Sequence, residues 1–132
     1  METRVVDLLG GAQVLGESLQ SNLDLVRATR EGLPAEAAVR LAQLISGIDV
    51  AATRPADPTG RLTSEQSDVV VRTATVLARA IDVLGDKKKA VHWLTTPNRA
   101  LGGEIPITLL DTSAGAHEAE ALLERIEYGV YS

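Results

Sequence analysis

The 132-residue sequence contains no cysteine and no phenylalanine, and it has only one tryptophan and two histidines. The absence of cysteine excludes a disulfide scaffold, a thiolate zinc site, an iron–sulfur cluster and a cysteine nucleophile. The two histidines, His92 and His117, are too few for a histidine-rich metal site, so we expect no metal. No apolar run approaches the roughly 18 residues that cross a bilayer, and the N-terminus lacks the pattern of a signal peptide. We therefore expect a cytoplasmic protein that does not bind membranes.

The scarcity of aromatic residues determines what the core can contain. They make up 2% of the chain, whereas apolar residues make up 45%. The core must therefore consist of leucine, valine, isoleucine and alanine, and leucine and alanine are strong helix formers. An all-β sandwich with this composition would be unusual. The composition predicts an all-α fold.

One proline-rich segment is the only place where the chain is expected to divide into two regions. Residues 49–61 contain two prolines and a glycine at a spacing that no regular element tolerates. We place the boundary there. Residues 1–60 then form a small region of short helices punctuated by glycine, similar to a helix-turn-helix, and residues 61–132 form a second helical region.

The second region carries the strongest local signals. Thr63–Gln66 has the pattern of a capping box, and the apolar stripe that follows it predicts one long helix over residues 63–84. Asp86 is expected to cap the next helix, and Asp111 or Thr112 the last one. These signals predict a helical domain that contains one long helix.

Each region has a helix with one apolar face that the pattern picks out. In the first region, Ser21 or Asn22 could cap a helix whose apolar face is Leu23, Leu25 and Val26. In the second region, the only tryptophan, Trp93, lies in a predicted amphipathic helix. A single tryptophan at such a position is usually part of the core, so we expect Trp93 to be buried there.

No combination of residues indicates a catalytic site. The serines are scattered, and none lies in a glycine-flanked nucleophile elbow. Glu120 and Glu124 are one helical turn apart, as paired catalytic carboxylates can be, but a solvated helix face explains them more simply. Neither GxGxxG nor GxxxxGK[ST] occurs, so no phosphate-binding loop is indicated. We expect no enzyme and no cofactor.

The charge of the first region argues against DNA binding. Residues 1–60 carry five arginines and eight acidic residues, whereas contacts to phosphates need a basic face. A local patch of Arg27, Arg30 and Arg40 leaves promoter DNA open as a partner, although surface solvation explains these arginines more simply. The DNA-binding residues, if there are any, cannot be assigned from the sequence.

The charge of the second region is uneven. Lys87, Lys88 and Lys89 begin a predicted helix, where the helix dipole would prefer acidic residues. Residues 111–132 instead carry five carboxylate side chains against the single base Arg125. This acidic end could complement a basic pocket on a protein partner.

Three motifs are spaced along the second region. They are residues 61–68, which lead into the predicted long helix, residues 92–98, HWLTTPN, followed by Ala100–Gly103 and Pro106, and residues 115–130. Together they resemble the ParS/MbcA/Xre antitoxins, in which they are similar to the entry into the long helix, the tryptophan- and glycine-containing signature and the closing segment. Asp49–Gly60 departs from the pattern because it lacks the basic recognition segment found there in the family, which weakens the case for promoter binding.

The resemblance implies a type II toxin–antitoxin module. Family members neutralise toxins with a RES domain, which resemble ADP-ribosyltransferases and consume NAD or transfer ADP-ribose. By analogy, residues 1–60 would be a degenerate Xre-like region that dimerises, and residues 61–132 would be the toxin-binding domain. The implied partner is a cognate RES-domain toxin, and we expect a homodimer or a hetero-oligomer with that toxin.

The family analogy and the acidic C-terminal end together suggest how such a toxin would be inhibited. An NAD site must bind a pyrophosphate and is expected to offer arginines, which pair well with carboxylates. Glu127, the Ser132 carboxylate, or both would pair with these arginines, while Tyr128, Val130 and Tyr131 fill the pocket. The predicted toxin-binding residues are Glu124, Glu127, Tyr128, Gly129, Val130, Tyr131 and Ser132.

Two other functions remain compatible with the sequence. The first is a DNA-binding transcriptional regulator, an autorepressor, that acts without any toxin. It would bind a promoter strongly and with marked salt dependence. The second is a non-catalytic helical adaptor for oligomerisation, which would self-associate without inhibiting an NAD-consuming enzyme.

Overall fold

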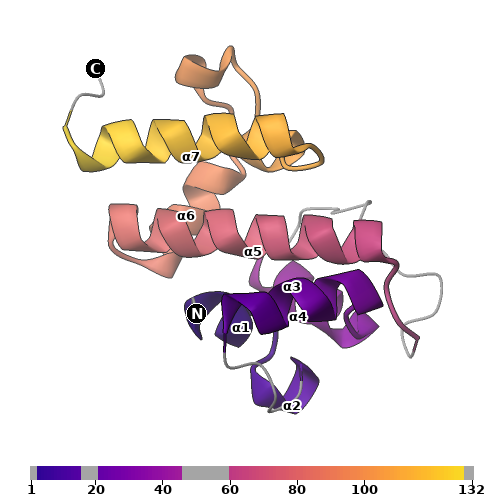
Figure 1. Cartoon of the computed structure of the whole chain (residues 1–132). Coiled ribbons are helices and arrows are strands. Elements are labelled where there is room, and N and C mark those ends of the chain that lie inside the picture. Colours follow the sequence, from indigo (N-terminus) through magenta and orange to yellow (C-terminus); the bar gives the residue numbers. More distant parts are fainter. Residues whose placement is uncertain (1–2, 16–20, 46–59, 130–132) are drawn as a thin grey trace. The chain divides into compact units, whose positions relative to one another are not determined.

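The computed structural model describes residues 3–15, 21–45 and 60–129 (Figure 1). All regular structure in these ranges is helical, and the only extended pairing there consists of two isolated β-bridges. The all-α prediction is therefore confirmed. None of the helices in the described ranges is long and apolar enough to cross a membrane.

The chain forms two compact units, which we call the N-terminal unit, Met1–Ala74, and the C-terminal unit, Thr75–Ser132. The division falls inside the long helix α5, Ser64–Leu84. The domain boundary predicted at residue 60 adjoins residues 46–59, which lie outside the described ranges. That boundary stays a prediction.

Four short helices precede α5 in the N-terminal unit. They are α1 (Thr3–Leu8), α2 (Ala12–Leu15), α3 (Asn22–Glu31) and α4 (Ala35–Leu44). The Ser21 side chain caps α3 by accepting a hydrogen bond of 3.1 Å from the backbone N–H of Asp24. The aliphatic core of this unit is as the composition predicts, with fully buried Val5, Leu9, Leu33, Leu41, Ile45 and Val70.

The turn between α3 and α4 pairs with the segment that leads into α5. The backbone N–H of Leu62 donates to the Leu33 carbonyl at 2.9 Å, and the N–H of Ala35 donates to the Gly60 carbonyl at 3.0 Å. Gly32 has φ +97°, and a Cβ at this position would lie 2.3 Å from the Leu62 carbonyl oxygen. Only glycine permits both this conformation and this close approach.

Helix α5 begins with the predicted capping box. The Gln66 N–H donates to Thr63 Oγ1 at 3.0 Å, and the Thr63 N–H donates to Gln66 Oε1 at 2.9 Å. This reciprocal pair satisfies two backbone donors that a helix start would otherwise leave unpaired. The long helix predicted over residues 63–84 is therefore confirmed, with Thr63 as its N-cap.

In the C-terminal unit, α5 is followed by a short helix, two 3₁₀ turns and a final helix. They are α6 (Lys87–Leu94), the 3₁₀ turns η2 (Arg99–Leu101) and η3 (Pro106–Leu109), and α7 (Ser113–Glu127). The predicted caps form, because Asp86 accepts from the N–H of Lys89 at 2.7 Å and Thr112 from that of Gly115 at 3.0 Å. The core is again aliphatic, with fully buried Val76, Leu77, Leu94, Leu110, Leu122 and Leu123.

Helix α7 lies very close to the segment before it. A Cβ on Gly115 would lie 1.8 Å from the Leu109 carbonyl oxygen, a distance that real Cβ atoms do not reach. Glycine in the first turn of α7 is therefore a packing requirement, since any side chain would push α7 away from η3. This contact fixes where α7 starts.

Candidate functional site

The predicted toxin-binding residues gather at the C-terminal end of α7. Glu124, Glu127, Tyr128 and Gly129 are all exposed there, and the Tyr128 side chain is 70% exposed. Gly129 has φ +72°, a conformation that ends the helix and that glycine adopts without strain. The other three predicted residues, Val130, Tyr131 and Ser132, lie outside the described ranges.

One of these residues already has a partner in its own chain. The Arg79 guanidinium donates two hydrogen bonds to the Glu127 carboxylate, at 2.8 and 3.3 Å. The hydrogen bonds from Arg79 to Glu127 raise the pKa of Arg79 above its ordinary value. This pair joins the C-terminal half of α5 to the end of α7.

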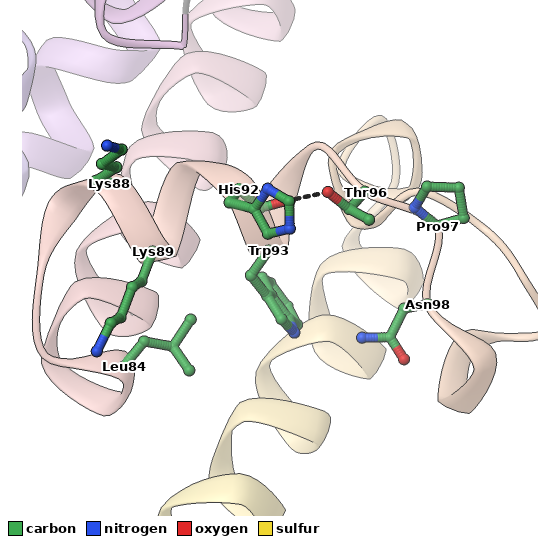
Figure 2. Close-up of a pocket in the computed structure, with 8 residues that line it drawn as sticks. All are labelled: Leu84, Lys88, Lys89, His92, Trp93, Thr96, Pro97 and Asn98. Atoms are coloured by element: carbon green, nitrogen blue, oxygen red, sulfur yellow. Dashed lines mark hydrogen bonds between the residues drawn. The ribbon is translucent and has the colours of Figure 1, made fainter.

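A second feature of the C-terminal unit is a surface cavity beside α6 (Figure 2). It has a volume of about 490 Å³, and its walls are mostly apolar. Figure 2 shows the Trp93 indole near the centre, with Leu84 and Lys89 on one side and Asn98 on the other. The lining residues are Leu84, Lys88, Lys89, His92, Trp93, Thr96, Pro97 and Asn98.

Trp93 is only half-buried, so the prediction that it belongs to the core is wrong. Its ring lines the cavity, yet its Nε1 atom is buried and has no hydrogen-bond partner. Core positions on the same helix are filled by Ala90 and Leu94, which are fully buried. The aliphatic residues thus form the core, and the indole is left at the surface of the unit.

The residues considered for other chemistry do not come together. Both histidines, His92 and His117, are exposed, and no group of three metal-ligating side chains occurs in the part of the chain that the structure describes. Two of the three arginines in the suggested basic patch face an acid on their own helix, since Arg27 lies 4.0 Å from Asp24 and Arg40 lies 3.3 Å from Glu36.

Comparisons with known proteins agree with the resemblance seen in the motifs. Residues 79–129 match the model of the antitoxin Xre/MbcA/ParS C-terminal toxin-binding domain. A protein named Antitoxin Xre from Yersinia enterocolitica is 42% identical over 81 residues, which are 61% of this chain and 55% of that relative. Another Antitoxin Xre, from Photorhabdus laumondii, is 37% identical over 90 residues, 67% of this chain and 61% of that relative.

The chain therefore spans between half and two thirds of the length of these two relatives. The matched residues include the cavity, helix α7 and the Arg79–Glu127 pair. The family is described by the binding of a toxin and not by a reaction, in agreement with the expectation that the chain is not an enzyme. Residues 79–129 are therefore similar to the C-terminal toxin-binding domain of the Xre/MbcA/ParS antitoxins.

Proposed function

We propose that this chain is an antitoxin that binds and neutralises a cognate toxin through its C-terminal unit. The observation that carries the proposal is the similarity to that toxin-binding domain of residues 79–129, which cover nearly all of that unit. The relatives that share this region bear the name Antitoxin Xre. The partner we propose is a RES-domain toxin that consumes NAD or transfers ADP-ribose.

In the proposed mechanism, the end of α7 and the residues after it cover the NAD site of the toxin. Tyr128 supports this role because a mostly exposed tyrosine ring offers a large apolar contact and a polar hydroxyl. Glu124 is exposed on the last full turn of α7, and no ion pair involves it among the described residues. Its carboxylate is available for an arginine that would otherwise bind the pyrophosphate of NAD.

Glu127 takes a different part in this mechanism from the one its charge suggested. Because Arg79 already holds it by two hydrogen bonds, Glu127 is better suited to orienting α7 than to pairing with the toxin. Glu124 and the residues after Glu127 then supply the direct contacts. The division of roles is testable, since loss of Glu124 should weaken inhibition without loosening α7.

Growth of cells that express the protein encoded by the neighbouring reading frame tests the proposal. Expressed alone, that protein should arrest growth, and co-expression of the full chain should restore it. A chain truncated after Glu127 should still co-purify with the toxin but should restore growth poorly. Glu124→Gln should also protect less well than Glu118→Gln, a matched control because Glu118 is exposed near the start of α7.

Two results would contradict parts of this proposal. If co-expression neither restores growth nor yields a complex, the chain is not an antitoxin for that protein. If the truncated chain protects as well as the full chain, the toxin is inhibited by the helix faces and not by the end of the chain.

A further inference from the structure

We propose that the cavity around Trp93 is a second contact site for the toxin, which takes an apolar side chain flanked by an acidic residue. This inference rests on the proposed function and adds a contact site that lies apart from the predicted toxin-binding residues at the end of α7. Four observations carry it: the volume of the cavity, the unpaired indole nitrogen, the hydrogen-bond donors around it and the lysines at its edge.

The unpaired Nε1 atom of Trp93 indicates that the site lacks an acceptor. A buried N–H without a partner costs about 1–3 kcal/mol, because it has lost its bond to water and gained none. Because Nε1 is closed to solvent, a carbonyl or carboxylate oxygen from a partner would satisfy it only after the indole shifts on binding. The cavity of about 490 Å³ can hold a large aliphatic or aromatic side chain next to that oxygen.

The polar groups around the cavity are mainly donors. The Asn98 carbonyl oxygen already accepts a hydrogen bond of 2.9 Å from the Ala100 N–H, which leaves the amide nitrogen free to donate. Figure 2 shows this nitrogen directed toward the Trp93 ring. Lys88 and Lys89 also line the cavity, and Figure 2 shows the Lys88 ammonium directed away from the Trp93 ring. A site with this excess of donors favours a ligand rich in acceptors and negative charge.

The position of the lysines supports an acidic partner. Lys87, Lys88 and Lys89 occupy the first turn of α6, where the helix dipole disfavours positive charge. None of them forms an ion pair with a carboxylate in the part of the chain that is described. Three adjacent lysines therefore oppose the dipole of the helix, and the carboxylate that caps this end, that of Asp86, accepts from the backbone N–H of Lys89. An acidic segment of the toxin would supply the missing charge.

Charge reversal at two neighbouring lysines gives a matched test. Lys89 lines the cavity and Lys87 does not, although both are exposed in the same turn. Either change to glutamate should leave α6 folded, since acidic residues suit a helix N-terminus. Lys89→Glu should weaken binding of the neighbouring frame's product about tenfold more than Lys87→Glu, as expected when one partner of an interfacial charge pair is reversed.

The single tryptophan provides a direct probe of the cavity. The chain is labelled with 5-fluorotryptophan, which places one fluorine at Trp93, and is mixed with the neighbouring frame's product purified from the dissociated complex. The fluorine resonance should shift on binding. Trp93→Phe, which keeps an aromatic ring but removes the N–H, should weaken binding severalfold while the circular dichroism spectrum stays unchanged.

The outcomes separate this inference from the proposed function. If the complex forms but the resonance does not shift and the two lysine variants bind equally, the cavity is not a toxin contact. If the resonance shifts with concentration in the isolated chain, a second copy occupies the cavity and the inference is overturned. If the wild-type chain forms no complex at all, the proposed function fails, and this inference fails with it.

Discussion

The two compact units of this chain differ in whether the buried polar atoms compared below have a hydrogen-bond partner. In the N-terminal unit, Ser67 and Thr73 are fully buried, and each has a partner. Ser67 Oγ accepts a hydrogen bond of 2.8 Å from the Leu33 N–H, and Thr73 Oγ1 donates to the Val69 carbonyl at 2.8 Å. In the C-terminal unit, the Trp93 Nε1 atom is buried without a partner.

This difference distinguishes groups that hold a fold together from groups that are left for a partner. A paired buried group contributes to stability, whereas an unpaired one costs free energy and persists only if something else is gained. The unpaired indole nitrogen, the lysines at the start of α6 and the exposed end of α7 all lie in the residues that match the toxin-binding family model. Changes in the N-terminal unit should therefore affect stability, and changes at these groups should affect binding.

The largest effect on stability is expected at Gly115, where the C-terminal unit is packed most tightly. Gly115→Ala should lower the free energy of unfolding by about 3 kcal/mol, because the new Cβ cannot fit beside the Leu109 carbonyl oxygen. Urea denaturation followed by circular dichroism measures the change. Gly102→Ala serves as the control, because a Cβ added there would have no atom within 4 Å and only the φ of +68° strains an alanine. This variant should lower the free energy of unfolding by about 1 kcal/mol. Equal losses in the two variants would contradict the packing argument.

A smaller loss is expected at Ser67, which tests the N-terminal side of the comparison. Ser67→Ala leaves the Leu33 N–H buried without an acceptor and should destabilise the protein by about 2 kcal/mol. Ser64→Ala, an exposed change on the same helix, should stay within about 0.5 kcal/mol of the wild type. Affinity for the toxin should not change in either variant at temperatures where both are folded. A loss of affinity confined to Ser67→Ala would show that the two units do not divide their roles in this way.

The smallest effect is expected at the Arg79–Glu127 pair. Both side chains are about one third exposed, at 38% and 34%, so their coupling in a double-mutant cycle to alanine should be about 0.5 kcal/mol. Glu127 raises the pKa of Arg79, so this contribution is complete below the pKa of the unfolded guanidinium and is lost only as the pH rises through the higher folded value. Near neutral pH the coupling should not depend on pH.

Salt should weaken this coupling, because exposed charges are screened. The cycle is measured by urea denaturation at about 0.05 M and about 1 M sodium chloride, conditions that change the Debye length severalfold. The Arg40–Glu36 pair on α4, with a distance of 3.3 Å, is the matched control within one helix. A coupling at Arg79–Glu127 that does not fall with salt would mean that the pair is held by more than surface electrostatics.

Features that depend on residues close together in the chain, such as helix caps, could be predicted from the sequence. The capping box at Thr63 and Gln66 and the cap at Thr112 form as expected, because such hydrogen bonds span only three residues. The all-α fold and the long helix follow from the same kind of signal. The resemblance carried by the motifs around Trp93 is confirmed by the family model that matches residues 79–129.

Features that depend on tertiary contacts were missed. Leu23 and Val26, on the predicted apolar face of α3, are 55% and 43% exposed, because periodicity shows that a helix has an apolar face but not whether another element covers it. The Arg79–Glu127 pair joins residues 48 positions apart, and no pattern in the sequence signals it. Trp93 was missed as a surface feature for the same reason.

An assay of NAD turnover tests whether this chain neutralises its proposed toxin. The protein encoded by the neighbouring reading frame is purified, and its consumption of NAD is measured while the full chain is titrated into the assay. We expect the consumption of NAD to fall to the background rate at a fixed molar ratio of the two proteins. Undiminished turnover in a mixture that demonstrably contains the complex would contradict it, since binding would then occur without neutralisation.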